Sequence, residues 1–207
     1  MNYFLTGGTG FIGRFLVKKL LARGGNVHLL VREESLDKLE ALREQWGDGA
    51  ERVHAVTGDL NKPGLGLDAK AHKALAGKVD HFFHLAAVYD MASDEATQQQ
   101  ANVDGTRHAL EAADALKAGC FHHVSSIAAA GLYKDTFRED MFDEATNLEH
   151  PYLKSKHDSE GVVRDECQVP FRIYRPGMVV GHSRSGEMDK VDGCRNGCPP
   201  WVLRADG

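Results

Sequence analysis

Residues 6–13 read Thr-Gly-Gly-Thr-Gly-Phe-Ile-Gly, and this stretch decides the fold. It follows the apolar segment 2–6 and leads into residues 11–23, whose apolar side chains recur at helical spacing. The chain must turn sharply here, and its glycines permit both positive φ angles and a close approach of bare backbone to a pyrophosphate. Unpaired N–H groups at the helix start favour the same anion. The stretch therefore predicts a nucleotide-binding turn between a strand and a helix, although the glycines also suit a tight turn without a ligand.

Short apolar segments alternate with longer amphipathic ones along the rest of the chain. The expected strands are residues 2–6, 26–31, 52–57, 80–85, 120–125 and 171–174. The expected helices are residues 11–23, 34–45, 68–76, 94–117 and 151–166. A loop is expected at 61–67, and Gly105 is expected to interrupt the long helix mildly. This order predicts an α/β fold, a doubly wound Rossmann sheet of parallel strands with helices on both faces.

Composition narrows the class of protein. The chain has 207 residues, 42% of them hydrophobic and 27% charged, which suits one domain with a substantial core. A net charge of -5 argues against general nucleic-acid binding. We find no apolar run of about 18 residues and no pattern of a signal peptide, so neither a membrane span nor secretion is expected.

Cysteines and histidines raise the question of a metal. The four cysteines favour a reducing cytoplasm, and Cys194 and Cys198 could form half of a zinc site that no second pair completes. Histidines stand in pairs, at 81 and 84 and at 122 and 123. Because adjacent residues of a strand point to opposite faces, His122 and His123 cannot share a ligand. We therefore expect no metal.

Tyr152 and Lys156 lie four residues apart on an expected helix, which places them on one face. An ammonium about 4 Å from a phenol is worth roughly 4 kcal/mol at an effective dielectric near 20, or about three pKa units. That shift brings a tyrosine near working pH as a proton donor. Ser126 directly follows the fifth expected strand, at the carboxyl edge of the sheet, where its hydroxyl can bond a substrate carbonyl oxygen. Each signal has an ordinary alternative: a surface Tyr-Lys pair, and a serine that caps a turn.

Arg32 follows the second expected strand, where an NAD-specific site usually has an acidic residue. A guanidinium there can pair with the 2′-phosphate of NADP. Glu33 comes next, so NAD stays open, and a solvated surface arginine is the plain alternative. We favour NADP.

Together these motifs resemble the extended branch of the short-chain dehydrogenases/reductases. Gly58-Asp59-Leu60 is similar to that branch's adenine-contacting site, and His84-Leu85-Ala86-Ala87 to its fourth-strand motif. Asn102 and Arg175-Pro176-Gly177 match segments near the nicotinamide. The resemblance implies Ser126, Tyr152 and Lys156 as the catalytic set. It implies cofactor contacts from Thr6, Gly7, Gly10, Phe11, Ile12, Gly13, Arg32, Asp59, Leu60, Leu85, Ala86, Ala87, Asn102, Tyr152, Lys156, Pro176 and Gly177.

Within that branch, residues 174–189 resemble the acyl-thioester reductases, which include fatty acyl-CoA reductases and carrier-protein thioester reductase domains. The expected function is hydride transfer from NADPH to an acyl-thioester or carbonyl substrate, with acyl-CoA or an acyl-carrier protein as candidate partners and a homodimer left open. Two alternatives stay open: a sugar-nucleotide epimerase or dehydratase, and a non-catalytic NAD(P)-binding sensor. The branch has a long region after Gly177, so we expect a Rossmann domain over 1–177 and an incomplete substrate region over 178–207.

Overall fold

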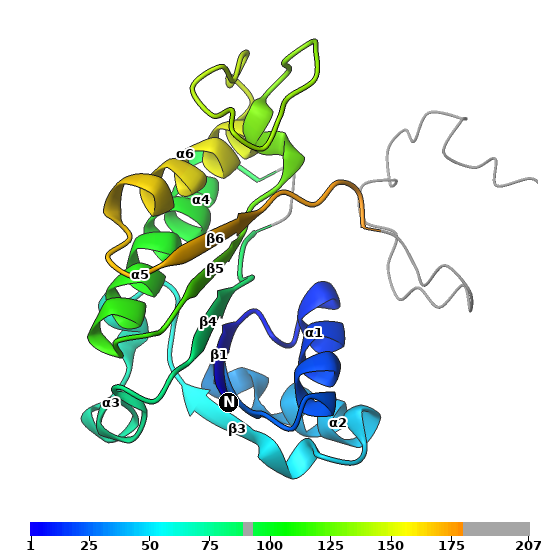
Figure 1. Cartoon of the computed structure of the whole chain (residues 1–207), viewed down its shortest axis with the longest axis vertical. Coiled ribbons are helices and arrows are strands. Elements are labelled where there is room, and N and C mark those ends of the chain that lie inside the picture. The colour runs from blue at the N-terminus through cyan, green and yellow to red at the C-terminus, as the bar shows by residue number, and fades with distance from the viewer. Residues whose placement is uncertain (89–92, 180–207) are drawn as a thin grey trace, which may run out of the picture. The chain divides into compact units, whose positions relative to one another are not determined.

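The computed structural model describes residues 1–88 and 93–179. Six strands form one parallel sheet in the order β3-β2-β1-β4-β5-β6 (Figure 1). Their bounds are β1 Asn2–Thr6, β2 Asn26–Val31, β3 Val53–Thr57, β4 His81–His84, β5 Phe121–Val124 and β6 Phe171–Tyr174. The chain starts in the middle of the sheet, moves outward to β3, and returns to build the other half from β4. This is the predicted α/β Rossmann fold.

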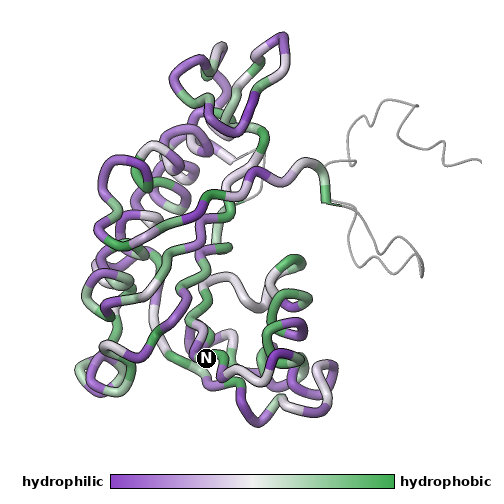
Figure 2. Tube along the Cα trace, in the orientation of Figure 1, coloured by the Kyte–Doolittle hydropathy of each residue, from purple (hydrophilic) through white to green (hydrophobic). Residues whose placement is uncertain are grey.

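Helices cover the two faces of the sheet. The first pair, α1 (Phe11–Ala22) and α2 (Leu36–Trp46), packs on one face, and Figure 2 shows α1 as largely hydrophobic. The opposite face carries α3 (Ala69–Leu75), α5 (Gly105–Ala115) and α6 (Pro151–Glu166). Single 3-10 turns span Glu33–Ser35, Ala50–Arg52, Pro63–Gly66 and Ile127–Ala130.

The strand pleat explains the two cores. Alternate residues of a strand point to opposite faces, so Phe4, Phe82 and Phe121 enter the core under α5 and α6, with ring centroids 4.7 and 5.3 Å apart along the row. Tyr3 and Leu5 enter the core under α1 and α2. Burial on both faces accounts for the continuous apolar run Tyr3-Phe4-Leu5 that predicted β1.

The long helix differs from its prediction. Residues 94–117 form α4 (Glu95–Gln98), a wider π-helical segment (Gln99–Asp104) and then α5. The sequence predicts an interruption at Gly105, but its backbone is helical, with φ -58° and ψ -34°. Glycine is needed there for a close approach, because a Cβ would come within 2.8 Å of the Leu60 side chain.

All these elements lie in one compact unit, Met1–Arg175, and residues 176–207 form a second unit. Within the described part of the chain, no helix is both long and apolar enough to cross a bilayer.

Candidate cofactor and active site

The glycine turn is fixed by backbone crowding. Gly7 has φ +70°, and a Cβ there would lie 2.6 Å from the backbone nitrogen of Ala86. A Cβ on Gly13 would lie 2.2 Å from the Gly7 carbonyl oxygen. The N–H of Gly10 donates to that same oxygen at 3.0 Å and closes the turn before α1. The sequence therefore has glycine where no side chain fits.

A cavity of about 350 Å³ opens beside this turn, at the carboxyl ends of the first four strands. Its walls are Gly7, Thr9, Gly10, Leu30, Val31, Arg32, Ser35, Gly58, Asp59, Leu60, Asn61, Ala86, Ala87, Val88 and Ala101. Seven residues expected to contact the cofactor thus meet in one cavity: Gly7, Gly10, Arg32, Asp59, Leu60, Ala86 and Ala87. Ligands of open α/β sheets bind at this edge.

A neighbouring cavity of about 290 Å³ brings two cations together. Arg32 and Lys62 both line it, with Glu33, Glu34 and Asp59. The Arg32 side chain is 63% exposed and pairs with Glu34 at 3.3 Å. Sequence reasoning missed Lys62, although a basic residue three positions after Asp59 was a usable signal.

Several other residues expected to contact the cofactor are not among those that line this cavity. Thr6 is buried, and its hydroxyl bonds His84 Nδ1 at 2.7 Å and accepts from the N–H of Ala86 at 3.3 Å. Leu85 packs against the core under α1 and α2. Phe11 and Ile12 begin α1, with Ile12 exposed. Pro176 and Gly177 belong to the second unit, so the structure does not place them relative to this site.

Helix α6 carries the expected catalytic pair. Pro151 occupies the first turn, and His150 Nδ1 accepts a hydrogen bond from the N–H of Tyr152 at 3.2 Å. Tyr152 and Lys156 are each 5% exposed. A surface Tyr-Lys pair, the plain alternative, is therefore wrong.

Ser126 lies on the element packed against α6. It begins the 3-10 turn Ile127–Ala130, and its Oγ accepts from the N–H of Ala128 at 3.1 Å. That turn contacts α6 through His157 Nδ1 and the Ala129 carbonyl, 3.0 Å apart. A hydroxyl that accepts one bond still has a hydrogen to donate, so capping and a role toward substrate are compatible. Ser125 differs, since it is buried and donates to Glu160 Oε2 at 2.8 Å.

Uncharged imidazoles lie near Lys156. Burial lowers the Lys156 pKa to about 8. Burial first, and then the Lys156 charge, lowers the pKa of His123 to about 3; burial, His123 and Lys156 hold the pKa of His84 well below its ordinary value. His84 bonds Thr6 and, through Nε2, the Thr106 hydroxyl at 3.1 Å. Among the residues that the structure describes, neither ring nitrogen of His123 has a hydrogen-bond partner.

Asn102 is held inside the π-helical segment. Its Oδ1 accepts from the N–H of Val88 at 2.8 Å, and its Nδ2 donates to Ser155 Oγ at 3.0 Å and Gln98 Oε1 at 2.7 Å. Asn102 therefore links the segment after β4 to α6, where its partner Ser155 directly precedes Lys156. Wider turns of this kind are frequent at functional sites.

A buried carboxylate, missed by sequence reasoning, anchors α6. Glu160 is fully buried and bonds Arg164, Arg175 and Ser125. Burial alone would raise its pKa, but the hydrogen bonds from these three partners outweigh burial and lower it. Two of these partners, Ser125 and Arg175, come from other parts of the chain, so the helix sequence alone does not reveal the burial of Glu160.

Comparison with known proteins identifies the family of this chain. The family model described as male sterility protein matches residues 5–198. The chain is 36% identical over 204 residues to a linear gramicidin synthase of Brevibacillus parabrevis, covering 91% of this chain and 4% of that protein. Among the curated relatives compared, the match to this chain covers between 4% and 22% of each relative's length, which is less than a quarter.

Two solved reductase domains share the fold and part of the sequence. The terminal R domain of the myxalamid PKS-NRPS pathway has a TM-score of 0.79 at 30% identity, covering 91% of this chain and 51% of that domain. The reductase (R) domain of a nonribosomal peptide synthetase from Mycobacterium tuberculosis has a TM-score of 0.72 at 28% identity, covering 88% and 49%. The chain thus spans about half of these domains. It belongs to the male sterility protein family of NAD(P)-binding reductase domains, within the extended short-chain dehydrogenases/reductases.

Proposed function

We propose that this chain is the NADPH-binding and proton-donating part of a reductase that acts on an acyl thioester held by a carrier domain or by coenzyme A. The observation that carries the proposal is the buried pair on α6, Tyr152 and Lys156, next to the turn that begins at Ser126. A lysine whose pKa burial lowers to about 8 has little solvation to lose when it meets a phenolate or a ribose. Relatives in peptide synthetases support the thioester as the substrate class.

When bound, NADPH supplies the hydride. The Ser126 hydroxyl would donate a hydrogen bond to the substrate carbonyl oxygen and stabilise the negative charge that grows there. Tyr152 would donate its proton to that oxygen, and the Lys156 ammonium would stabilise the phenolate left behind. Loss of the thiol from the reduced carbon then leaves an aldehyde, so one thioester, one NADPH and one proton give one aldehyde, one thiol and NADP⁺.

The cofactor preference rests on Arg32 and Lys62. Both line the cavity beside the expected adenosine site, and the Arg32 side chain is held there by Glu34. A 2′-phosphate would take Arg32 from this exposed ion pair, which is worth at most about 1 kcal/mol, and form charge-assisted bonds instead.

Cofactor titration tests this preference separately from turnover. The double variant Arg32→Ala/Lys62→Ala is expected to bind NADPH at least 10-fold more weakly with NADH affinity unchanged, as measured by the fluorescence of the reduced cofactor. Lys18→Ala, an exposed lysine on α1, is the matched control. An equal loss for both cofactors would contradict the 2′-phosphate role.

The reaction is tested with a short acyl-pantetheine thioester and NADPH. The expected products are NADP⁺ and an aldehyde, trapped as its hydrazone. Conversion of UDP-sugars with no net use of NADPH, and failure on thioesters, would reject the thioester proposal in favour of an epimerase.

A further inference from the structure

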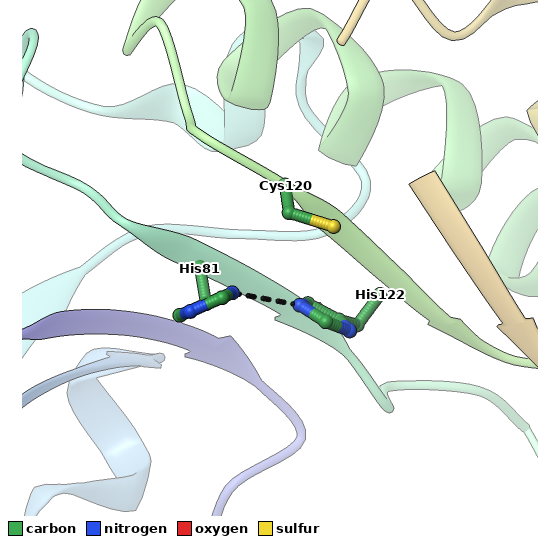
Figure 3. A group of neighbouring side chains, drawn as sticks. All are labelled: His81, Cys120 and His122. Carbon is green, nitrogen blue, oxygen red and sulfur yellow. Dashed lines mark hydrogen bonds between the residues drawn. The ribbon is translucent and has the colours of Figure 1, made fainter. Parts of the chain in front are cut away.

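Two imidazoles and a thiol meet at the amino ends of β4 and β5, the sheet edge opposite the glycine turn (Figure 3). The register pairs Phe82 with Phe121 and Phe83 with His122. Because the pleat alternates, His81, Cys120 and His122 share the face opposite to the one that carries Phe82 and Phe121. Their ligand atoms all lie within 4.8 Å of one another, and His81 Nδ1 is 3.0 Å from His122 Nε2.

The surrounding side chains hold His122 as a ligand would be held. The Tyr174 hydroxyl oxygen lies 2.9 Å from His122 Nδ1, and the Phe83 ring stacks on the imidazole at 4.2 Å. If Nδ1–H donates to Tyr174, Nε2 carries the lone pair and accepts the hydrogen bond from His81 Nδ1, and a metal bound between the two rings would take the place of that hydrogen. Metal-bound histidines nearly always make such an outer hydrogen bond, which fixes ring and tautomer. On the other side, the Tyr3 ring stacks on His81 at 5.8 Å.

A positive charge lies beside the group. Arg172 pairs with His122 in the register and is exposed, so solvent screens its repulsion of a cation. A metal must also displace the proton of the Cys120 thiol in order to bind its sulfur.

We propose that His81, Cys120 and His122 form a binding site for one borderline-soft divalent cation of the Zn²⁺ class, with its fourth position open to water. Tetrahedral zinc with ordinary bond lengths separates two nitrogen ligands by about 3.3 Å and a nitrogen from a sulfur by about 3.6 Å. The observed 3.0 Å and the 4.8 Å limit need only small side-chain adjustments to meet these values. Two imidazoles with one thiolate select zinc or copper over magnesium or calcium.

Cobalt titration of the chelator-treated chain tests the site. Co²⁺ is expected to bind one equivalent and give a sulfur-to-cobalt charge-transfer band with intense tetrahedral d–d bands, which Zn²⁺ then removes. Cys120→Ser is expected to abolish the charge-transfer band, and His81→Gln to weaken Zn²⁺ affinity at least 10-fold. Thermal unfolding followed by circular dichroism confirms that each variant is folded before it is scored.

Two controls separate this site from other thiols. Cys167→Ser alters a cysteine packed against the opposite core, and Cys194→Ser/Cys198→Ser removes the C-terminal pair; both are expected to keep the band. Tyr174→Phe keeps all three ligands and is expected to weaken Zn²⁺ binding by about 10-fold, as loss of an outer hydrogen bond does. The proposal fails if the unaltered chain gives no thiolate band, if the band survives Cys120→Ser, or if it disappears with Cys194 and Cys198.

Discussion

The glycine turn and the start of helix α6 lie at the same carboxyl edge of the sheet, yet they are specified in opposite ways. The turn depends on missing side chains, since a Cβ on Gly13 would come within 2.2 Å of a carbonyl oxygen. Helix α6 depends on polar side chains that are buried at a cost, such as Lys156 with a pKa of about 8. His123 of β5, whose pKa the Lys156 charge helps to lower, has two ring nitrogens without a hydrogen-bond partner in the described structure. The turn is thus set by sterics and the helix by electrostatics.

This difference predicts which substitutions should lower stability and cofactor binding together, and which should lower activity alone. At the turn, the glycines expected to contact the cofactor also permit the fold, so stability and binding should fall together. On the helix, the polar groups proposed for chemistry are buried at a cost, so stability and activity should separate. Four variants, from the largest expected effect to the smallest, test this contrast.

Gly13→Ala is expected to have the largest effect. The new methyl group overlaps the Gly7 carbonyl and the Gly8 backbone, neither of which can move as a side chain could. We expect a loss of about 4 kcal/mol in unfolding free energy and loss of NADPH binding, measured by urea denaturation and fluorescence titration. Gly10→Ala is the control, because its Cβ would meet the same oxygen at 3.2 Å and should cost much less. If Gly13→Ala kept its stability but lost the cofactor, the turn would not unite the two roles.

Tyr152→Phe is expected to lower activity without lowering stability. Removing the proton donor should lower kcat for aldehyde formation by about 10²- to 10⁴-fold, the usual contribution of a general acid. Cofactor affinity and unfolding free energy should change little. Tyr3→Phe removes another buried tyrosine hydroxyl, outside the site, and should retain turnover. Retained turnover in Tyr152→Phe would exclude the phenol from the mechanism.

Lys156→Met is expected to stabilise the cofactor-free fold while it abolishes activity. The folded pKa of about 8 lies below the ordinary 10.5, so between these pH values the unfolded chain holds a proton that the folded chain has released. Unfolding free energy therefore rises with pH over this window by about 3 kcal/mol, and the penalty is fully present below pH 8.

The Lys156→Met variant lacks this titration, so it should exceed the parent by up to about 3 kcal/mol at pH 7 and by almost nothing near pH 10.5. Urea denaturation across this range measures the difference. A gap between the two proteins that stays constant with pH would mean that the ammonium is not desolvated.

His123→Leu is expected to have the smallest effect, a gain of about 1 kcal/mol in unfolding free energy. It replaces a buried imidazole, whose ring nitrogens have no hydrogen-bond partner among the described residues, with an apolar side chain of similar size. His84→Leu is the matched control and should lose about 1–2 kcal/mol, because it leaves the buried Thr6 and Thr106 hydroxyls without the ring. If His123→Leu destabilised the fold, an ordered water or another group must bond this ring.

Local rules explain what could be predicted from the sequence. The turn at residues 6–13, the apolar strands and the Tyr152–Lys156 spacing all depend on near neighbours in the chain, and the structure has them as expected. The opposite orientation of His122 and His123 was likewise predictable from the pleat and is confirmed by their contacts.

Long-range contacts explain what could not be predicted. The π-helical segment depends on the hydrogen bonds that Asn102 makes with residues far along the chain. Lys62 joins Arg32 only because the loops after β2 and β3 meet. The approach of Cys120 to His81 depends on the register of two strands about 40 residues apart, which no periodicity reports.

The Glu160 cluster has a consequence for cooperativity. Its carboxylate joins α6 to the end of β5 through Ser125 and to the end of β6 through Arg175, whose guanidinium also bonds the carbonyls of Arg138 and Met141. A four-residue strand at the edge of a sheet would normally fray alone. Tied in this way, β6 should open only when α6 opens, so the amide protons of both would exchange with solvent as one unit.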